Sequence, residues 1–154
     1  MTRIIHAIQE VVSTPLSFDF PSKKVQEICL AAYSLDKANG QLPIVNSITE
    51  HRWDLMELYG PYKFKVILMA SERLEDVEEV MVAKGNKTTD EIYSTARRAA
   101  LRLKNDCGMP LDHIFIDMSV SAIIADTEGL NRSTVEAIKL IGACLLYTSD
   151  AADE

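Results

Sequence analysis

Short apolar runs alternate along this chain with longer amphipathic stretches. Four runs have the pattern of buried strands: PLSFDF at 15–20, LPIVNSI at 42–48, FKVILMAS at 64–71 and HIFID at 113–117. Apolar residues at helical spacing predict helices at 3–12, at 22–39, around Trp53 up to Gly60, at 88–108 and at 133–143. Helices and strands therefore alternate from one end to the other, which favours parallel strands joined by crossover helices.

Local signals fix several of these boundaries. Thr88 with Glu91, and Ser133 with Glu136, each have the spacing of a capping box at a helix start. The acidic stretch ERLEDVEEVMVAKGNK at 72–87 separates the third strand from the long helix. We expect a loop there that includes a short helix.

The predicted fold class is α/β, and two architectures fit the order of elements. One is an open doubly wound sheet, and the other is an arc of a (β/α)8 barrel. In both, side chains at the carboxyl ends of the strands face the ligand. Asp19, Asn46, Ser71 or Glu72, and Asp117 lie at such ends. A buried carboxylate without a partner is costly, so Asp117 either has a partner or faces solvent or a ligand.

Two carboxylates and a carboxamide suit the recognition of a flat heterocycle with a donor-rich edge. A carboxylate accepts two parallel N–H bonds, and an amide both donates and accepts. Three further residues are candidate loop contacts to such a ligand: Ser47, Ser71 and Asp126. The alternative is that each polar side chain at a strand end caps a neighbouring helix.

Composition narrows the function classes. The chain has 154 residues, of which 47% are hydrophobic and 25% charged, as is typical of one globular domain. Its net charge of −7, without a basic cluster, argues against nucleic-acid binding. No apolar run approaches the roughly 20 residues that span a bilayer. The three cysteines are far apart, and the spacing of the histidines suggests no metal site. We expect a cytoplasmic protein with reduced thiols and no bound metal.

The last eleven residues, CLLYTSDAADE, differ from the rest. They match, residue for residue, the translation of a transposase adapter used in sequencing-library preparation. We therefore expect the natural sequence to stop near Ala143, so that 1–143 is a domain fragment and 144–154 a non-native tail. Beyond Thr148 we expect fraying or disorder.

Four motifs taken together resemble the pterin-binding barrel superfamily: SFDFPS, IVNSIT, FKVILMASE and IFIDMSVSAIIADTEGLN. This superfamily includes the dihydropteroate synthases and the methyltetrahydrofolate:corrinoid methyltransferases. The resemblance covers roughly residues 3–143. It implies a (β/α)8 barrel in which Asp19, Asn46 and Asp117 hold the pterin ring. This chain would supply the third to sixth β/α units of a barrel that it does not close.

The residues after Asp117 separate the two branches. Dihydropteroate synthases usually continue with a proline and a glycine-rich stretch. Here Met118 and SVSAIIADTEGLN follow, and this segment is more similar to the one found in the methyltransferases. The segment GNKTTDEIYSTA at 85–96 also resembles the entry to their fifth helix. The resemblance therefore implies methyl transfer from methyltetrahydrofolate, or a related pterin, to cobalamin carried by a partner corrinoid protein.

The same resemblance implies which part of the pterin each residue contacts. Asp117 would anchor the amino-pyrimidinone edge, Asn46 would bond a ring nitrogen, and Asp19 would complete the polar floor. The residue that faces the pterin N5 would lie on a later strand, outside this chain, and the full-length protein could form a homodimer. Dihydropteroate synthase-like chemistry is one alternative function. A non-catalytic ligand-binding module, or an inactive fragment, is the alternative from another class.

Overall fold

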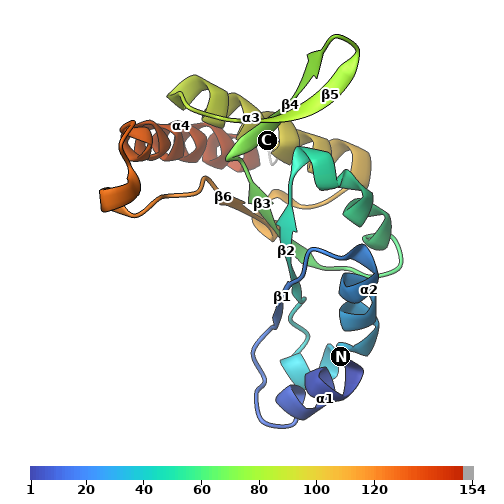
Figure 1. Cartoon of the computed structure of the whole chain (residues 1–154). Helices are drawn as coiled ribbons and strands as arrows, with labels where there is room; N and C mark the ends of the chain where they lie inside the picture. Colours follow the sequence, from blue (N-terminus) through green and yellow to red (C-terminus); the bar gives the residue numbers. More distant parts are fainter. Residues whose placement is uncertain (151–154) are drawn as a thin grey trace. The chain divides into compact units, whose positions relative to one another are not determined.

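The computed structural model describes residues 1–150, with side chains up to Cys144. Figure 1 shows the helices α1 to α4 and the strands β1 to β6. The α-helices are α1 (Thr2–Gln9), α2 (Lys23–Ala32), α3 (Thr89–Cys107) and α4 (Leu130–Asp150). The strands are β1 (Ser17–Asp19), β2 (Ile44–Ile48), β3 (Lys65–Met69), β4 (Glu72–Val77), β5 (Val80–Gly85) and β6 (Ile114–Asp117). Short 3₁₀ helices cover Asp36–Ala38, Glu50–Leu58, Leu111–His113 and Ile123–Ala125.

Four strands form a parallel sheet in the order β1-β2-β3-β6, which confirms the predicted α/β class. The four apolar runs of the sequence supply these four strands. Backbone hydrogen bonds hold the sheet together, for example from Lys65 N to Pro43 O and from Ala70 N to Asp117 O, both 2.8 Å long. The chain divides into two compact units. The first comprises Met1–Ile48 with Arg52–Ile67, and the second comprises Thr49–His51 with the chain from Leu68 onward.

The first unit contains α1, α2, β1, β2 and the start of β3. Phe18 of β1, Val45 of β2 and Cys29 of α2 are buried in it. The ring of Phe18 meets that of Tyr33 edge-on, with the ring centroids 6.1 Å apart. Phe18 and Val45 are thus buried on one side of the two strands, and Asp19 and Asn46 on the other side are less buried, although Ile48 on that side is buried as well.

Three predictions for the first unit were wrong in detail. Helix α1 ends at Gln9, before the predicted end at residue 12. Helix α2 ends at Ala32, and Asn39, with a φ of 54°, ends the short 3₁₀ helix that follows it. The segment around Trp53 is 3₁₀-helical and contains a non-helical residue, Arg52.

The second unit is built around α3 and α4. Ala70, Ile92, Ala96, Met118, Ala137 and Ile141 form its buried core. The capping box predicted at the start of α3 is present: Thr88 Oγ1 accepts from Glu91 N, and Glu91 accepts from the backbone N–H of Thr88. Gly108, with a φ of 64°, ends α3 as expected of a glycine in the left-handed region.

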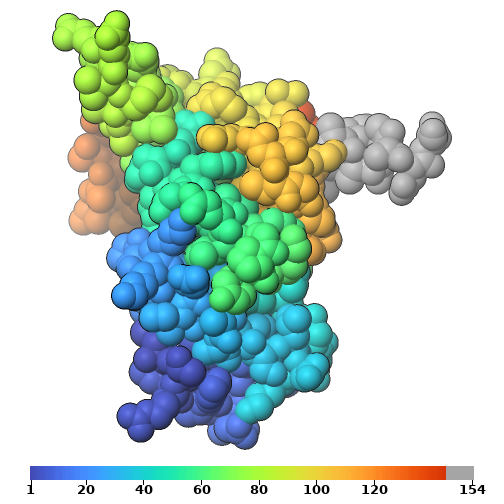
Figure 2. Space-filling model, turned by 90° about the vertical axis from the view of Figure 1, so that its right-hand side faces the viewer, coloured from blue at the N-terminus to red at the C-terminus, as the bar shows by residue number. Residues whose placement is uncertain are grey.

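Residues 72–87 form an antiparallel hairpin, so the predicted loop with a short helix was wrong. Strand β4 pairs with β5 from Glu72 opposite Gly85 to Val77 opposite Val80. The hairpin projects from the second unit in both Figure 1 and Figure 2, where it is yellow-green. Its residues alternate in register, and Glu75 accepts hydrogen bonds from Arg73 and Lys84. The bond from Lys84 crosses between the strands, whereas Arg73 and Glu75 are neighbours on the same face of β4, and both bonds offset the negative charge of Glu75.

Three further predictions for the second unit were wrong, the second of them only for the described residues 149–150. Helix α4 begins at Leu130, so Ser133 and Glu136 lie inside the helix and do not cap it. The same helix continues to Asp150, past Thr148, where fraying was expected; residues 151–154 lie outside the described part. Strand β6 is not buried on both faces, because Phe115 is 46% exposed. Among the described residues, no helix is both long and apolar enough to cross a membrane.

Candidate functional site

Asp19 and Asn46 face the same side of the sheet as direct neighbours. Asp19 is the last residue of β1, and the parallel register places it opposite Asn46 of β2. The preceding pair, Phe18 and Val45, is buried on the opposite face. Adjacent strands lie about 4.8 Å apart, so the carboxylate and the carboxamide can contact one planar ligand together. The sequence predicted this pairing from two separate motifs.

Gln26 of α2 holds the backbone under this pair, and sequence reasoning missed it. Its side chain is fully buried, and Nε2 donates to Phe18 O at 2.8 Å, Phe20 O at 3.0 Å and Asn46 O at 3.2 Å. One amide group therefore links the carboxyl ends of β1 and β2. The signal in the sequence was a glutamine next to the apolar positions Val25 and Cys29 of an otherwise ordinary helix.

The loop that follows Asp19 is also fixed. Arg52 Nη2 donates to Phe20 O at 3.2 Å and to Pro21 O at 3.0 Å. On the other strand, Ser47 follows Asn46 through a cis peptide bond and is buried. Hydrogen bonds from Gln26 thus fix the backbone near Asp19 and Asn46. Hydrogen bonds from Arg52 fix the loop after Asp19.

Asp117 ends β6 in the second unit, as the sequence predicted. Its side chain is exposed, and Oδ1 accepts a hydrogen bond of 2.7 Å from Ser119 N. This bond shapes the turn after the strand, where Ser119 has a φ of 55°. In the described part of the chain, Oδ2 of Asp117 has no hydrogen-bond partner. Asp117 is therefore partly a turn residue, and one carboxylate oxygen stays available to a ligand.

A cavity of about 290 Å³ opens beside the end of β6. It is lined by Ser71, Gly85, Asn86, Lys87, Ile92, Met118, Ser119, Ser121, Leu130 and Thr134. Ser71 therefore lines a cavity of the second unit, where a loop contact was expected. Asp117 does not line it, although Met118 and Ser119 follow directly. Sequence reasoning missed the contribution of β5 to this cavity because it did not predict the hairpin.

Asn86 organises the floor of this cavity. It is buried, and Nδ2 donates to Ala70 O at 2.8 Å and to Thr95 Oγ1 at 3.1 Å. Its Oδ1 accepts from Arg73 Nη1 at 2.7 Å. The backbone N–H of Asn86 also bonds to Ser71 O. All of these bonds connect the base of the hairpin to the end of β3 and to α3.

Asp126 caps α4. Its Oδ1 accepts from Leu130 N at 2.6 Å, and its Oδ2 accepts from Asn131 N at 3.0 Å. This explains why α4 begins before Ser133: a carboxylate at this position satisfies two N–H groups of the first turn. Both oxygens of Asp126 are engaged in this way, which is the helix-capping alternative considered for polar residues after strands.

Ion pairs fix the polar groups around the hairpin. Glu50, whose side chain is only 13% exposed, accepts from Arg98 Nε at 2.8 Å and from Leu74 N at 3.0 Å. Burial opposes the ionisation of Glu50, but these two donors hold its pKa below the ordinary value. Hydrogen bonds from Lys84 and Arg73 likewise lower the pKa of Glu75. These carboxylates are therefore ionised at neutral pH and already have partners.

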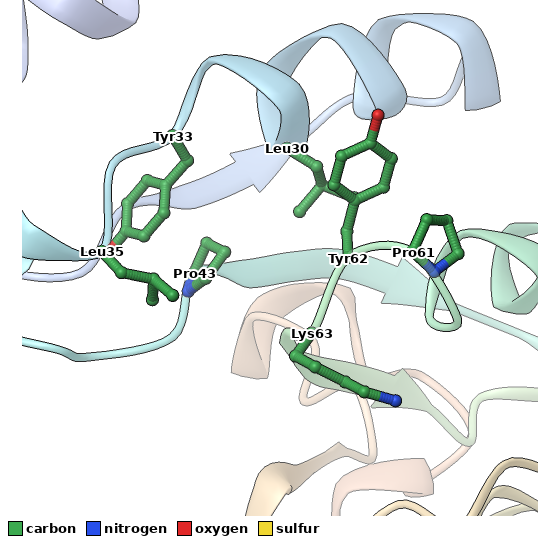
Figure 3. A pocket seen from close by; sticks show the side chains of 7 residues that line it. All are labelled: Leu30, Tyr33, Leu35, Pro43, Pro61, Tyr62 and Lys63. Atoms are coloured by element: carbon green, nitrogen blue, oxygen red, sulfur yellow. The ribbon is translucent and has the colours of Figure 1, made fainter.

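A third set of residues surrounds a smaller cavity of about 160 Å³ at the opposite strand ends (Figure 3). Pro43 precedes β2 and Lys63 precedes β3. The rest of the lining, also from the first unit, consists of Leu30, Tyr33, Leu35, Pro61 and Tyr62. In sheets of this class, ligands bind at the carboxyl ends of strands. This cavity is accordingly not the candidate site.

No protein-family model and no curated protein sequence matches this chain. Among the described residues, no three His, Cys, Asp or Glu side chains are grouped so that they could hold a metal ion. The described residues offer two separate sets of donors and acceptors: the Asp19–Asn46 pair in the first unit, and Asp117 beside a cavity in the second.

Proposed function

We propose that this chain binds a pterin at the carboxyl ends of its parallel strands, as part of a cytoplasmic enzyme that transfers a methyl group from a methylated tetrahydrofolate-type pterin to a corrinoid protein. The observation that carries the proposal is the register of Asp19 with Asn46. A carboxylate and a carboxamide side by side can together accept from and donate to the edge of a fused heterocycle.

The proposed fold is an arc of a (β/α)8 barrel. Its support is the parallel order β1-β2-β3-β6, in which helical segments separate consecutive strands. On β1 and β2, alternate residues on one face are less buried than their neighbours: Asp19 next to Phe18, and Asn46 next to Val45. In a barrel this face is the interior, where side chains from all strands meet.

The residues of this chain would act by binding and orienting the pterin. Oδ2 of Asp117 would accept from the amino-pyrimidinone edge, and the Asn46 amide would bond a ring nitrogen. Methyl transfer breaks the bond between the methyl carbon and N5, and N5 must gain a proton as the electron pair returns to it. The corrinoid of the partner supplies the nucleophile that takes the methyl group. Asp19, exposed at the end of β1, would belong to the polar network around the ring.

The direct test is an assay of the protein that contains this chain. Methyltetrahydrofolate and free cob(I)alamin are mixed with the protein, and formation of methylcobalamin is followed by its absorbance. We expect turnover that is lost or strongly reduced in Asp19→Ala and Asn46→Ala, while Asp36→Ala, a carboxylate in a short 3₁₀ helix away from the strand ends, retains it. Condensation of a dihydropterin pyrophosphate with p-aminobenzoate, without methyl transfer, would contradict the proposal in favour of a dihydropteroate synthase.

A further inference from the structure

The second unit contains a further cavity, of about 330 Å³, which shares no residue with the candidate sites described above. It is formed by the segment after β2, by the hairpin and by α3, and β4 packs against α3 (Figure 1). All of its lining residues belong to the second unit. Its volume falls within the range of small-molecule sites. The lining consists of Glu50, Arg73, Leu74, Met81, Arg98 and Arg102.

Arginines dominate the charge of this lining, although the chain as a whole has a net charge of −7. Arg98 and Arg102 are four residues apart on α3, so their side chains share one face of the helix. Arg73 is already paired with two carboxylates, Glu75 and Glu91. The two arginines of α3 are therefore the cations that matter for a ligand in this cavity.

Arg98 retains hydrogen-bonding capacity. It donates through Nε to Glu50 at 2.8 Å, and in the part of the chain that the structure describes its Nη1 and Nη2 have no hydrogen-bond partner. Arg102 has a carboxylate partner in Asp106, at 3.2 Å. Glu50, the one carboxylate of the lining, is fully used, because its other oxygen accepts from Leu74 N at 3.0 Å. The lining thus offers donors to an anion and leaves its own carboxylate occupied.

An apolar wall completes the cavity. Met81 is opposite Asp76 in the hairpin, and Asp76 is two residues from Leu74, so Leu74 and Met81 lie on the same face. A ligand that fits this lining combines a negatively charged head with an apolar body. One negative charge suits the site better than two, because Arg73 and Arg102 are already balanced by carboxylates outside the lining.

We propose that this cavity binds a small monocarboxylate with an apolar body, such as an aromatic acid, and that Nη1 and Nη2 of Arg98 hold its carboxylate. The outer edge of a guanidinium group donates two parallel N–H bonds, which match the two oxygens of a carboxylate. Leu74 and Met81 contact the body of the ligand. This binding site is an addition to the proposed methyl transfer and does not depend on it.

The probe for the test is 4-fluorobenzoate, which joins a carboxylate to a rigid apolar ring and is followed by its fluorine NMR signal. It is titrated into the protein that contains this chain, and we expect a Kd of about 1 mM or below. Unlabelled benzoate should displace it. Benzamide has the same shape without the charge, acetate has the charge without the ring, and inorganic phosphate is an anion without an apolar body. Each of these three should need a concentration about tenfold higher or more.

Two matched variants locate the site. Arg98→Lys keeps a positive charge beside Glu50 but loses the pair of parallel donors. We expect it to raise the Kd for 4-fluorobenzoate about tenfold or more. Arg97→Lys changes the neighbouring exposed arginine of α3, which does not line the cavity, and should leave the Kd unchanged. Met81→Thr keeps a side chain that suits a strand but shortens the apolar wall, so it should also raise the Kd.

Three results would overturn the proposal: no saturable binding by the folded wild type, equal binding by Arg98→Lys and the wild type, or displacement by benzamide as effective as by benzoate. Asp19→Ala should bind 4-fluorobenzoate normally. If Asp19→Ala loses binding and Arg98→Lys keeps it, the acid binds at the strand ends and the arginine-lined cavity is refuted. Methyl transfer is assayed separately, so its failure and the failure of this site are distinguishable.

Discussion

At the scale of single residues, the candidate site depends on which side chains form hydrogen bonds with the backbone groups around the strand ends. Asp19, Asn46 and Asp117 were predicted because each interrupts an apolar strand; the structure places Asp19 and Asp117 at the carboxyl ends of β1 and β6, but Asn46 in the middle of β2. Gln26 and Asn86 could not be found in this way, since neither of them interrupts an apolar strand. Their function is visible only in their hydrogen bonds.

Gln26 gives the first residue-scale prediction. In Gln26→Leu, the carbonyls of Phe18, Phe20 and Asn46 lose their common donor, and buried acceptors without partners cost about 1–3 kcal/mol. We expect the free energy of unfolding, measured in urea, to fall by about that amount. Gln41→Leu is the control, because Gln41 is exposed. Equal stability of the two variants would show that the Gln26 bonds are not needed.

The same substitution has a second expected result. If the bonds of Gln26 set the positions of Asp19 and Asn46, Gln26→Leu should also weaken pterin binding at a temperature where the variant is fully folded. A destabilised variant with unchanged affinity would assign Gln26 to stability alone.

At the scale of elements, the sequence predicted those whose apolar pattern and caps agree. The four sheet strands and α3 were predicted correctly, because apolar runs and the Thr88–Glu91 capping box specify them locally. The hairpin was missed because its turn residues, Glu78 and Glu79, are not the glycine or asparagine that usually mark a two-residue turn. The start of α4 was missed because Asp126 caps it across a loop, outside the S/T-x-x-E spacing.

The turn of the hairpin gives the element-scale prediction. Glu78 and Glu79 have φ values of 52° and 66°, as in a type I′ turn, where glycine or asparagine is preferred. A residue with a side chain costs roughly 1–2 kcal/mol in this conformation. We expect Glu79→Gly to slow amide hydrogen exchange in β4 and β5. Glu79→Ala removes the same carboxylate without relieving the backbone, so it should not slow exchange; equal protection in both variants would contradict the explanation.

At the scale of the whole molecule, the sequence predicted the α/β class and the parallel order of strands, and the structure confirms both. The assignment to a barrel stays a prediction. Pattern alone does not distinguish an arc of a barrel from an open sheet, since both repeat the same β/α unit and both place polar residues at the carboxyl ends of strands. The division into two units was not foreseen either, because no change in composition marks it.

The central claim is that these strand ends bind a pterin, and calorimetry tests it most directly. Methyltetrahydrofolate is titrated into the protein that contains this chain, into Asp117→Asn, and into Asp112→Asn, which changes an exposed carboxylate just before the start of β6. We expect the wild type to bind, Asp117→Asn to weaken binding by about 1.5–3 kcal/mol, the scale of a hydrogen bond to a charged group, and Asp112→Asn to leave it unchanged. No binding by the wild type, or equal binding by all three folded proteins, would contradict it.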